Sequence, residues 1–409
     1  MESGDGADAE TPAVPESLTG GRGAAMGAGS LYPRFSDQEY ARRHRLLREA
    51  MKGAGLDALV LWGGPGAAEI SWVVNYVPHS PCWLVFPREG RITCFVHFYN
   101  HIPAAKAQAI IDDVRWYGPS PAETVAEHLR GEGFGDRAIG VVTLNAMPHA
   151  HYVGLTRRLP EAKFTEFGRE FNRIRWVRSE EEQVFVKKSG HLTDLVCEAL
   201  EARLRPGQSE HDILAIVYDA YARHGGDPQV HFIASTPMAK PDRFVPWQRM
   251  TNRTIDVGSV VITELTVSYW GYATQIHRPF AIGQAPTPLY QELFDAALEC
   301  FERVRRLCRP GVTSEEIVAA ASVIEERGFT TYDSVFHGER GKFPELGTRS
   351  AVHPLEPWTL VENMVHVIQP NPITRDHTAG LQLGAAVLVT PAGGELLHHY
   401  PFKFPVCGA

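Results

Sequence analysis

Residues 261–280 read VITELTVSYWGYATQIHRPF, and this stretch decides the fold. Two runs rich in β-branched and aromatic residues flank the turn SYWGY (268–272), which is the pattern of a β-hairpin. Alternation along the strands places Glu264 on one face of its strand and Gln275 with His277 on one face of the next, and antiparallel pairing can bring all three together. Polar side chains on one face of such a hairpin predict that it lines a pocket.

Length and composition limit the class of protein. The chain has 409 residues, 44% of them hydrophobic, and a formal net charge of -8. It is long enough for two domains, and its modest acidity argues against a nucleic-acid or anionic-membrane partner. No apolar run reaches bilayer length and the N-terminus lacks a secretory signal, so we expect a soluble cytoplasmic protein. Six scattered cysteines without a CxxC pair argue against a zinc knuckle or a disulfide framework.

The chain divides into three parts. Residues 1–30 are rich in Gly, Ala, Pro and acidic residues, a composition that predicts a disordered tail. A capping box, Ser36 to Glu39, predicts a helix, and alternating strands and helices indicate an α/β domain over residues 31–172. A second capping box, Ser179 to Glu182, begins the helix that opens a domain over residues 173–409.

Two similar segments lie within the second domain. RPGQSEHDI (205–213) is matched by RPGVTSEEI (309–317), and in each segment a Pro-Gly pair ends one helix while Ser or Thr caps the next. Both segments are followed by β-rich sequence. The repetition predicts a duplicated α+β domain with internal pseudo-symmetry.

The order of these motifs resembles the creatinase/aminopeptidase P family. The capped helix at Ser36, the paired Pro-Gly turns, the hairpin YWGY (269–272), FHG (336–338) and MVHVIQP (364–370) carry the resemblance, which covers roughly residue 32 to the end. It implies an α+β fold in which a smaller α/β creatinase-type domain precedes a pita-bread catalytic-type domain. It also implies a homodimer in which the N-terminal domain closes the site of the partner.

Most members of that family are dinuclear metallohydrolases with two Asp, one His and two Glu as ligands. The five ligand positions fall, in order, on Glu264, Gln275, His337, Gln369 and Gly384. Neutral amides and a glycine cannot supply the negative charge that a hard divalent pair needs. The sequence therefore predicts no bound metal and no cofactor. A family histidine that assists peptidase chemistry falls near Trp247, which argues against ordinary aminopeptidase activity.

The strand pattern and the resemblance together predict a site. We expect three catalytic residues, Glu264, His337 and His277, and five substrate-binding residues, Gln275, Gln369, Trp247, Tyr272 and His79. Parity along the strand turns His366 away from the site. The structural alternatives are an ion pair between Glu264 and Arg278, and glutamines that are inert remnants of lost ligands.

Three functions remain open. The main interpretation is a metal-independent, creatinase-like hydrolase or lyase that cleaves a C–N or similar bond in a small polar metabolite, with Glu264 and His337 as the central groups. The second is a catalytically silent binding module. The third is a mononuclear metallohydrolase or peptidase that uses Glu264, His337 and either His277 or His377.

Overall fold

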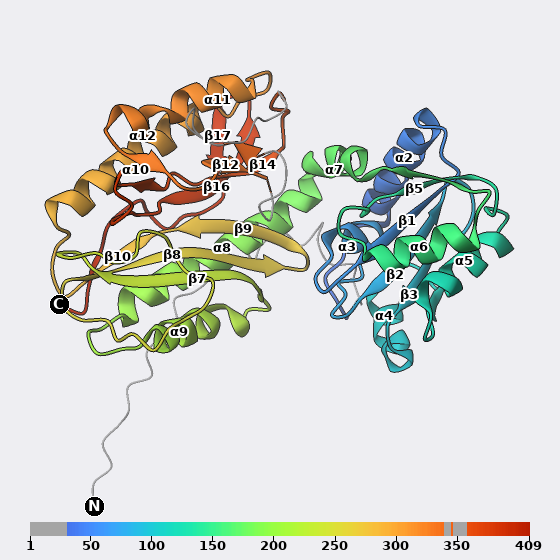
Figure 1. Ribbon diagram of the computed structural model, residues 1–409, viewed down its shortest axis with the longest axis horizontal. Coiled ribbons are helices and arrows are strands. Elements are labelled where there is room, and N and C mark those ends of the chain that lie inside the picture. Colours follow the sequence, from blue (N-terminus) through green and yellow to red (C-terminus); the bar gives the residue numbers. More distant parts are fainter. Residues whose placement is uncertain (1–30, 339–344, 347–357) are drawn as a thin grey trace, which may run out of the picture.

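The computed structural model describes residues 31–338, 345–346 and 358–409, so the predicted disordered tail lies outside the described residues. Two lobes, each built on one principal β-sheet, lie side by side and are joined through α7 (Gly168–Trp176) and α8 (Glu180–Arg203) (Figure 1). The predicted domain boundary at residues 172–173 falls within α7 and stays a prediction. In the described residues, none of the helices is long and apolar enough to cross a membrane.

The N-terminal lobe has a six-stranded mixed sheet in the order β4-β3-β2-β1-β5-β6. Antiparallel pairing joins β1 to β2 and β2 to β3, while the other neighbours run parallel. Its strands are β1 (Ala58–Gly63), β2 (Cys82–Pro87), β3 (Thr93–Val96), β4 (Val114–Trp116), β5 (Ala138–Val141) and β6 (Lys163–Glu166). Its helices are α2 (Asp37–Gly53), α3 (Ala68–Val74), α4 (Ile102–Gln108), α5 (Pro121–Gly131), α6 (His149–Arg158) and α7, with a 3-10 turn at Tyr99–His101.

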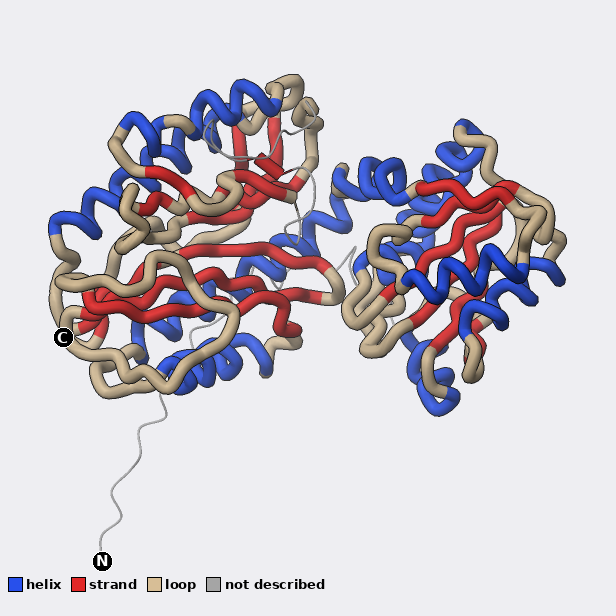
Figure 2. The backbone as a smooth tube through the Cα atoms, viewed as in Figure 1, coloured by secondary structure: helices blue, strands red, loops and turns tan. Residues whose placement is uncertain are grey.

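Both faces of this sheet are covered, which explains why its central strands are apolar without interruption. Leu59 and Leu84 point into a cluster with residues of α2, α3 and α7, whereas Val60 and Val85 point into a second cluster with α5 and α6. The strands and their flanking helices are visible in Figure 2. The observed lobe is the α/β arrangement that the alternating sequence pattern predicted.

The C-terminal lobe has a ten-stranded sheet in the order β13-β12-β14-β16-β9-β8-β10-β18, with β7 also paired to β8 and β17 to β16. Its strands are β7 (Asp227–Pro237), β8 (Ser259–Tyr269), β9 (Tyr272–His277), β10 (Pro279–Ile282), β12 (Phe336–His337), β13 (Glu345–Leu346), β14 (Val365–Ile368), β16 (Gly384–Thr390), β17 (Gly393–Leu396) and β18 (Val406–Cys407). A separate pair comprises β11 (Thr330–Thr331) and β15 (Pro372–Ile373). The helices are α8, α9 (Glu210–Ala222), α10 (Pro288–Leu307), α11 (Ser314–Ala321) and α12 (Val323–Glu326).

The two Pro-Gly segments occupy equivalent positions in this lobe. Gly207 follows α8 with φ of 91°, and Gly311 follows α10 with φ of 90°. The Gly207 amide donates to Ile255 O over 2.8 Å, and the Gly311 amide donates to Leu360 O over 2.9 Å. Ser209 and Thr313 then cap α9 and α11 through reciprocal capping boxes. The predicted α+β duplication is therefore confirmed.

The hairpin of residues 261–280 forms as predicted, with β8 and β9 joined through a two-residue turn. Tyr269 pairs with Tyr272 across the turn, and Trp270 and Gly271 both have positive φ, at 50° and 84°. This is the type I′ geometry, which matches the twist of paired strands. A Cβ atom at Gly271 would lie 2.7 Å from Ser71 Oγ, so the turn also packs closely against the N-terminal lobe.

Candidate functional site

A cavity of about 290 Å³ lies on the polar face of the hairpin in the C-terminal lobe. Strands β7, β8, β9 and β14, together with the segment from residue 333 to His337, supply its walls. Polar and apolar side chains both line it: Gln229, Val230, Phe232, Glu264, Thr266, Ala273, Thr274, Gln275, Asp333, Ser334, His337, Val367 and Gln369. Four predicted site residues, Glu264, Gln275, His337 and Gln369, are therefore in one cavity.

Glu264 and Gln275 meet across the hairpin. Thr266 on β8 pairs with Gln275 on β9, and Glu264 is two residues from Thr266 on the same face. Gln275 Nε2 donates a hydrogen bond of 2.6 Å to Glu264 Oε1. The strand alternation predicted this convergence correctly, while the roles of the two side chains stay a prediction.

The Glu264 carboxyl group is held in a protonation range suited to proton transfer. Burial raises its pKa to about 7, and the negative charge of Asp333 acts in the same direction, against hydrogen bonds from Gln275 and Gln382. A carboxyl group with a pKa near neutrality can both accept and donate a proton at that pH. Asp333 lies in a loop before β12, where neither alternation nor a motif marked it.

His337 is fixed from both sides of its ring. Nε2 lies 3.0 Å from Gln369 Oε1, and Nδ1 lies 2.6 Å from Gly338 O. The other end of the Gln369 amide donates 2.9 Å to Ser334 O, which sets the orientation of the amide. Both oxygens that face the ring are acceptors, so the tautomer of His337 decides which ring nitrogen donates a hydrogen bond. Gln369 is therefore an orienting partner of His337 in this arrangement.

His277 is set apart from the cavity, although it shares the strand face of Gln275. It pairs with Gly384 of β16, is fully buried, and neither ring nitrogen has a hydrogen-bond partner among the described residues. Burial lowers its pKa well below the ordinary value, and the charges of His337 and Arg278 act in the same direction. His277 does not line the cavity, because its ring packs beside Gly384 of the neighbouring strand β16, and its catalytic role stays a prediction.

Arg278 is not the partner of Glu264, so this structural alternative is wrong. Its guanidinium donates to four backbone carbonyl groups, those of His277, Gly384, Tyr400 and Pro401, at 2.7–3.1 Å. The guanidinium therefore ties the end of the hairpin to β16 and to the C-terminal segment. Its charge is satisfied without a carboxylate from the cavity.

The other three predicted substrate-binding residues do not line the cavity. Trp247 is 42% exposed and its ring packs under the Arg243 guanidinium, 3.9 Å from the centroid. Tyr272 lies on the opposite strand face from Gln275, where its hydroxyl donates 3.0 Å to Glu182 at the junction of the two lobes. His79 is exposed on a loop of the N-terminal lobe. A dimer contact at His79 stays a prediction.

The residues present do not fit the paired metal ions that the family implies. Among residues 31–338, 345–346 and 358–409, no three His, Cys, Asp or Glu side chains converge so that they could hold an ion. A Cβ atom at Gly384 would lie 2.6 Å from His277 Nδ1 and 2.9 Å from Gln369 Cα, so the last ligand position has no space for a side chain. The absence of a bound metal stays a prediction.

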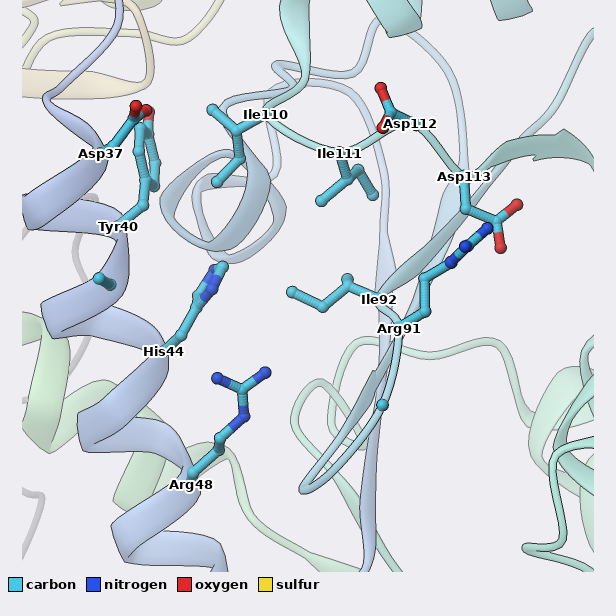
Figure 3. Close-up of a pocket in the computed structure, with 12 residues that line it drawn as sticks. Asp37, Tyr40, His44, Arg48, Arg91, Ile92, Ile110, Ile111, Asp112 and Asp113 are labelled. Atoms are coloured by element: carbon cyan, nitrogen blue, oxygen red, sulfur yellow. The ribbon is translucent and has the colours of Figure 1, made fainter.

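A second cavity, of about 500 Å³, lies in the N-terminal lobe between α2, the β2–β3 turn and the segment after α4 (Figure 3). His44, Arg48, Ile92, Ile110 and Ile111 surround it. Two of its carboxylates are already paired, Asp37 with Arg34 and Asp113 with Arg115. None of the predicted site residues lines it, so the cavity beside Glu264 is the candidate site.

Comparisons with known proteins extend over both lobes. The model of metallopeptidase family M24 matches residues 185–391, and that of the creatinase/prolidase N-terminal domain matches residues 43–177. The uncharacterized peptidase YqhT of Bacillus subtilis is 24% identical, over 76% of this chain and 86% of that protein. The probable dipeptidase PepE of Mycobacterium tuberculosis is 26% identical, over 73% of this chain and 79% of that protein.

Solved structures show the same fold. The X-Pro aminopeptidase of Thermotoga maritima superposes with a TM-score of 0.76 at 19% identity, covering 89% of this chain and 99% of that chain. The dipeptidase PepE of Mycobacterium ulcerans gives a TM-score of 0.73 at 22% identity, covering 92% of this chain and all of that chain.

These relatives correct the main functional interpretation. They are named as peptidases and dipeptidases, so the prediction of a metal-independent hydrolase or lyase for a small polar metabolite is wrong, and the peptidase alternative is favoured. The predicted resemblance, by contrast, is confirmed by the two matched models and by the fold. The chain belongs to metallopeptidase family M24, with a creatinase-type N-terminal domain and a pita-bread C-terminal domain.

Proposed function

We propose that this chain acts on short peptides as a hydrolase, through the cavity between β8, β9 and β14. The observation that carries the proposal is the grouping of Glu264 and His337 in one cavity within the region matched by the M24 model. The cavity has room for a small ligand only, and its lining includes the apolar side chains of Phe232, beside Glu264, and Val367, beside His337.

The residues of the chain have separable tasks in this proposal. Glu264 exchanges a proton with the reacting group, because its pKa of about 7 keeps both of its protonation states populated near neutrality. His337 is oriented by Gln369 and presents its ring toward the same cavity. Gln275 holds the Glu264 carboxylate in place.

The test is turnover of a dipeptide panel, with and without proline as the second residue, by the purified full-length chain. Free amino acids are measured by mass spectrometry, once with added Mn²⁺ and once after dialysis against EDTA. We expect product with the wild type and at least a hundredfold less with Glu264→Gln. The matched control is Glu362→Gln, at an exposed position outside the cavity, which should retain full turnover. Equal turnover by Glu264→Gln and the wild type would contradict the proposal.

A catalytically silent binding protein is the second candidate. One observation favours it: Glu264 and His337 are each engaged by a glutamine amide, so both groups have a neutral partner without any ligand. This candidate predicts saturable dipeptide binding in calorimetry with no product in either metal condition after prolonged incubation. Product in either condition excludes it.

A further inference from the structure

A groove beside α2 in the N-terminal lobe has no part in the proposed function. The cavity of about 500 Å³ shown in Figure 3 continues into a hollow of about 900 Å³, because Ala41, His44 and Arg48 of α2 line both. Residues 88–92, between β2 and β3, form part of the facing wall. We call the combined space the α2 groove. Its smaller part alone has the volume of a site for a small molecule.

Arg48 is the cationic group at which the two parts of the α2 groove meet. Its side chain is half-buried, and the guanidinium lies over the Phe86 ring, with Cζ 5.2 Å from the ring centroid. Such a cation–π contact holds the guanidinium in place but uses none of its N–H donors along the edge of the fork. Among the described residues, no carboxylate lies within ion-pair distance of Arg48. Its charge and its donors are therefore available to a ligand in the groove.

Most of the other charged side chains beside the α2 groove already have a partner of opposite charge. The pairs are Asp37–Arg34, Asp113–Arg115, Arg45–Glu49 and Arg88–Asp57. The remaining groups are two cations and two anions at exposed positions, Lys52, Arg91, Glu89 and Asp112, whose charges cancel. Within the described residues, Arg48 is thus the half-buried charge of the groove that lacks a counter-charge. A buried or half-buried charge of this kind favours an anionic ligand.

His44, one helical turn before Arg48, contributes a hydrogen-bond acceptor. Its Nε2 lies 2.8 Å from Val73 O, and a carbonyl oxygen only accepts, so Nε2 carries the proton. Burial lowers the pKa of His44 and the charge of Arg48 acts in the same direction, against the hydrogen bond to Val73. The ring is therefore neutral near pH 7, and Nδ1 is an acceptor for a hydroxyl or an amide N–H of the ligand.

Three isoleucines form an apolar wall in the smaller part of the α2 groove. Ile92 comes from the start of the β3 segment, and Ile110 with Ile111 comes from the segment after α4. Figure 3 shows these side chains across the cavity from α2. We call them the isoleucine wall. An aliphatic group of a ligand that contacts this wall is removed from water, which is favourable.

We propose that the α2 groove binds a small organic acid, whose carboxylate pairs with Arg48 and whose aliphatic part lies against the isoleucine wall. The planar fork of a guanidinium matches the two oxygens of a carboxylate. An N–H or hydroxyl group next to the carboxylate donates to His44. The site is separate from the cavity beside Glu264, so the inference does not rest on the proposed function.

Titration calorimetry on the full-length chain tests this site with N-acetyl-leucine, which has a carboxylate, an amide N–H and an aliphatic side chain. N-acetyl-leucinamide has the same body without the charge and should bind at least about tenfold less tightly. The acid 4-methylpentanoate lacks the amide and should bind about threefold less tightly than N-acetyl-leucine. Both differences are measured side by side on one protein preparation.

The variants separate the two contacts of the ligand. Arg48→Met removes the guanidinium but keeps an unbranched apolar chain, and it should weaken binding of N-acetyl-leucine about tenfold and leave N-acetyl-leucinamide unchanged. Arg48→Lys keeps the charge without the planar fork and should retain part of the affinity. Ile111→Ser should weaken both probes by the same factor. The matched control is Arg157→Met, at an exposed arginine of α6 outside the groove, which should bind like the wild type.

Other outcomes overturn the inference. Equal affinities for N-acetyl-leucine and N-acetyl-leucinamide would show that no anion is recognised. Binding that Glu264→Gln abolishes and Arg48→Met leaves unchanged would place the probe in the other cavity. Phosphate that binds through Arg48 as tightly as N-acetyl-leucine would replace the organic acid by a simple anion. If no probe binds, the site does not exist. Turnover of dipeptides by Arg48→Met should equal that of the wild type, so failure of this site leaves the proposed function standing.

Discussion

His277 fills the space that a side chain at Gly384 would need. The two residues pair across β9 and β16, and a Cβ atom at Gly384 would lie 2.6 Å from His277 Nδ1 and closer still to the Ile368 carbonyl oxygen. Real Cβ atoms do not approach backbone oxygens so closely, so the strands would have to separate. The position that carries a ligand in most of the family is here part of a tightly packed strand contact.

Gly384→Ala should therefore destabilise the protein although it adds only one methyl group. Overpacking against backbone atoms costs about 1–3 kcal/mol. The measurement is urea unfolding of the variant and the wild type. The control is Gly53→Ala, at the end of α2, where a Cβ atom meets nothing within 4 Å. Equal unfolding midpoints for Gly384→Ala and the wild type would show that the strands relax at no cost.

The tight packing around Gly384 also predicts that acidic residues introduced at the family's ligand positions will not create a metal site in this protein. The triple variant Gln275→Asp, Gln369→Glu, Gly384→Glu should bind no stoichiometric Mn²⁺ by elemental analysis, because the Ile368 carbonyl oxygen and the His277 ring exclude the last side chain. Adding His277→Gly to the triple variant is the informative comparison, because it removes the side-chain contact and leaves the backbone contacts at 2.4 and 2.9 Å, so we expect this variant to bind no stoichiometric Mn²⁺ either. Full metal loading of the triple variant alone would contradict the packing argument.

Local patterns predicted much of this fold. Ser179 and Glu182 form a reciprocal capping box, and the YWGY segment forms the expected hairpin turn, because both depend on residues within a few positions of each other. Face assignment by alternation was correct for Glu264 and Gln275. It was insufficient for His277, because the ring packs beside Gly384 of the neighbouring strand β16, which is more than one hundred residues away in the sequence.

Parity and loop geometry explain two differences between the predicted residues and those that line the cavity. Tyr272 is three residues from Gln275 on β9, so it points to the other face, and alternation alone excluded it from the site. Asp333 enters the cavity from a loop, whose course depends on tertiary packing rather than on a repeating pattern. Charged loop residues close to a motif residue such as His337 are the only signal that could have indicated it.

Glu264→Gln should stabilise the protein at alkaline pH and change little at acidic pH. The pKa of Glu264 is raised from 4.5 to about 7, so above pH 4.5 the unfolded state ionises while the folded state retains its proton. The resulting cost grows from pH 4.5 to pH 7 and is fully present above that, at roughly 1–3 kcal/mol. A glutamine at position 264 does not ionise, so the variant does not have this cost in folding free energy. Urea unfolding at pH 5 and pH 8 measures the difference, and a pH-independent gap between the proteins would contradict the prediction.

Glu182 has the opposite behaviour, because it is a fully buried carboxylate with cationic partners. Burial alone raises its pKa, but the charges of Arg43 and Arg178 outweigh that effect and hold the pKa at about 2. Trp72 Nε1 and Tyr272 OH donate to the same oxygen over 2.9 Å and 3.0 Å. One carboxylate thus links α2 and α3 of the N-terminal lobe to the hairpin of the C-terminal lobe.

Glu182→Gln should therefore cost about 3–5 kcal/mol at pH 7, because it leaves buried arginines without their counter-charge. The stabilisation is present above the unfolded pKa of 4.5 and is lost as the pH falls toward 2, so the variant and the wild type should converge in acid. Thermal unfolding between pH 3 and pH 7 measures this. Glu49→Gln, at an exposed position of α2, should show no such convergence. If the unfolding temperatures of the variant and the wild type differ by the same amount across that range, the variant loses stability through packing rather than through charge.

The duplicated turns offer a comparison within one molecule. Gly207 and Gly311 have φ near 90°, and a Cβ atom at either position would meet nothing within 4 Å, so alanine there introduces backbone strain and no steric contact. Because L residues rarely adopt such φ values, each Gly→Ala substitution should cost about 1–2 kcal/mol. Since the two turns are equivalent in the pseudo-symmetric lobe and lie far apart, the costs should be equal and should add in the double variant. Urea unfolding of the two single variants and the double variant tests this, and costs that differ by more than about 1 kcal/mol would show that the two halves have diverged in how rigidly they hold the turn.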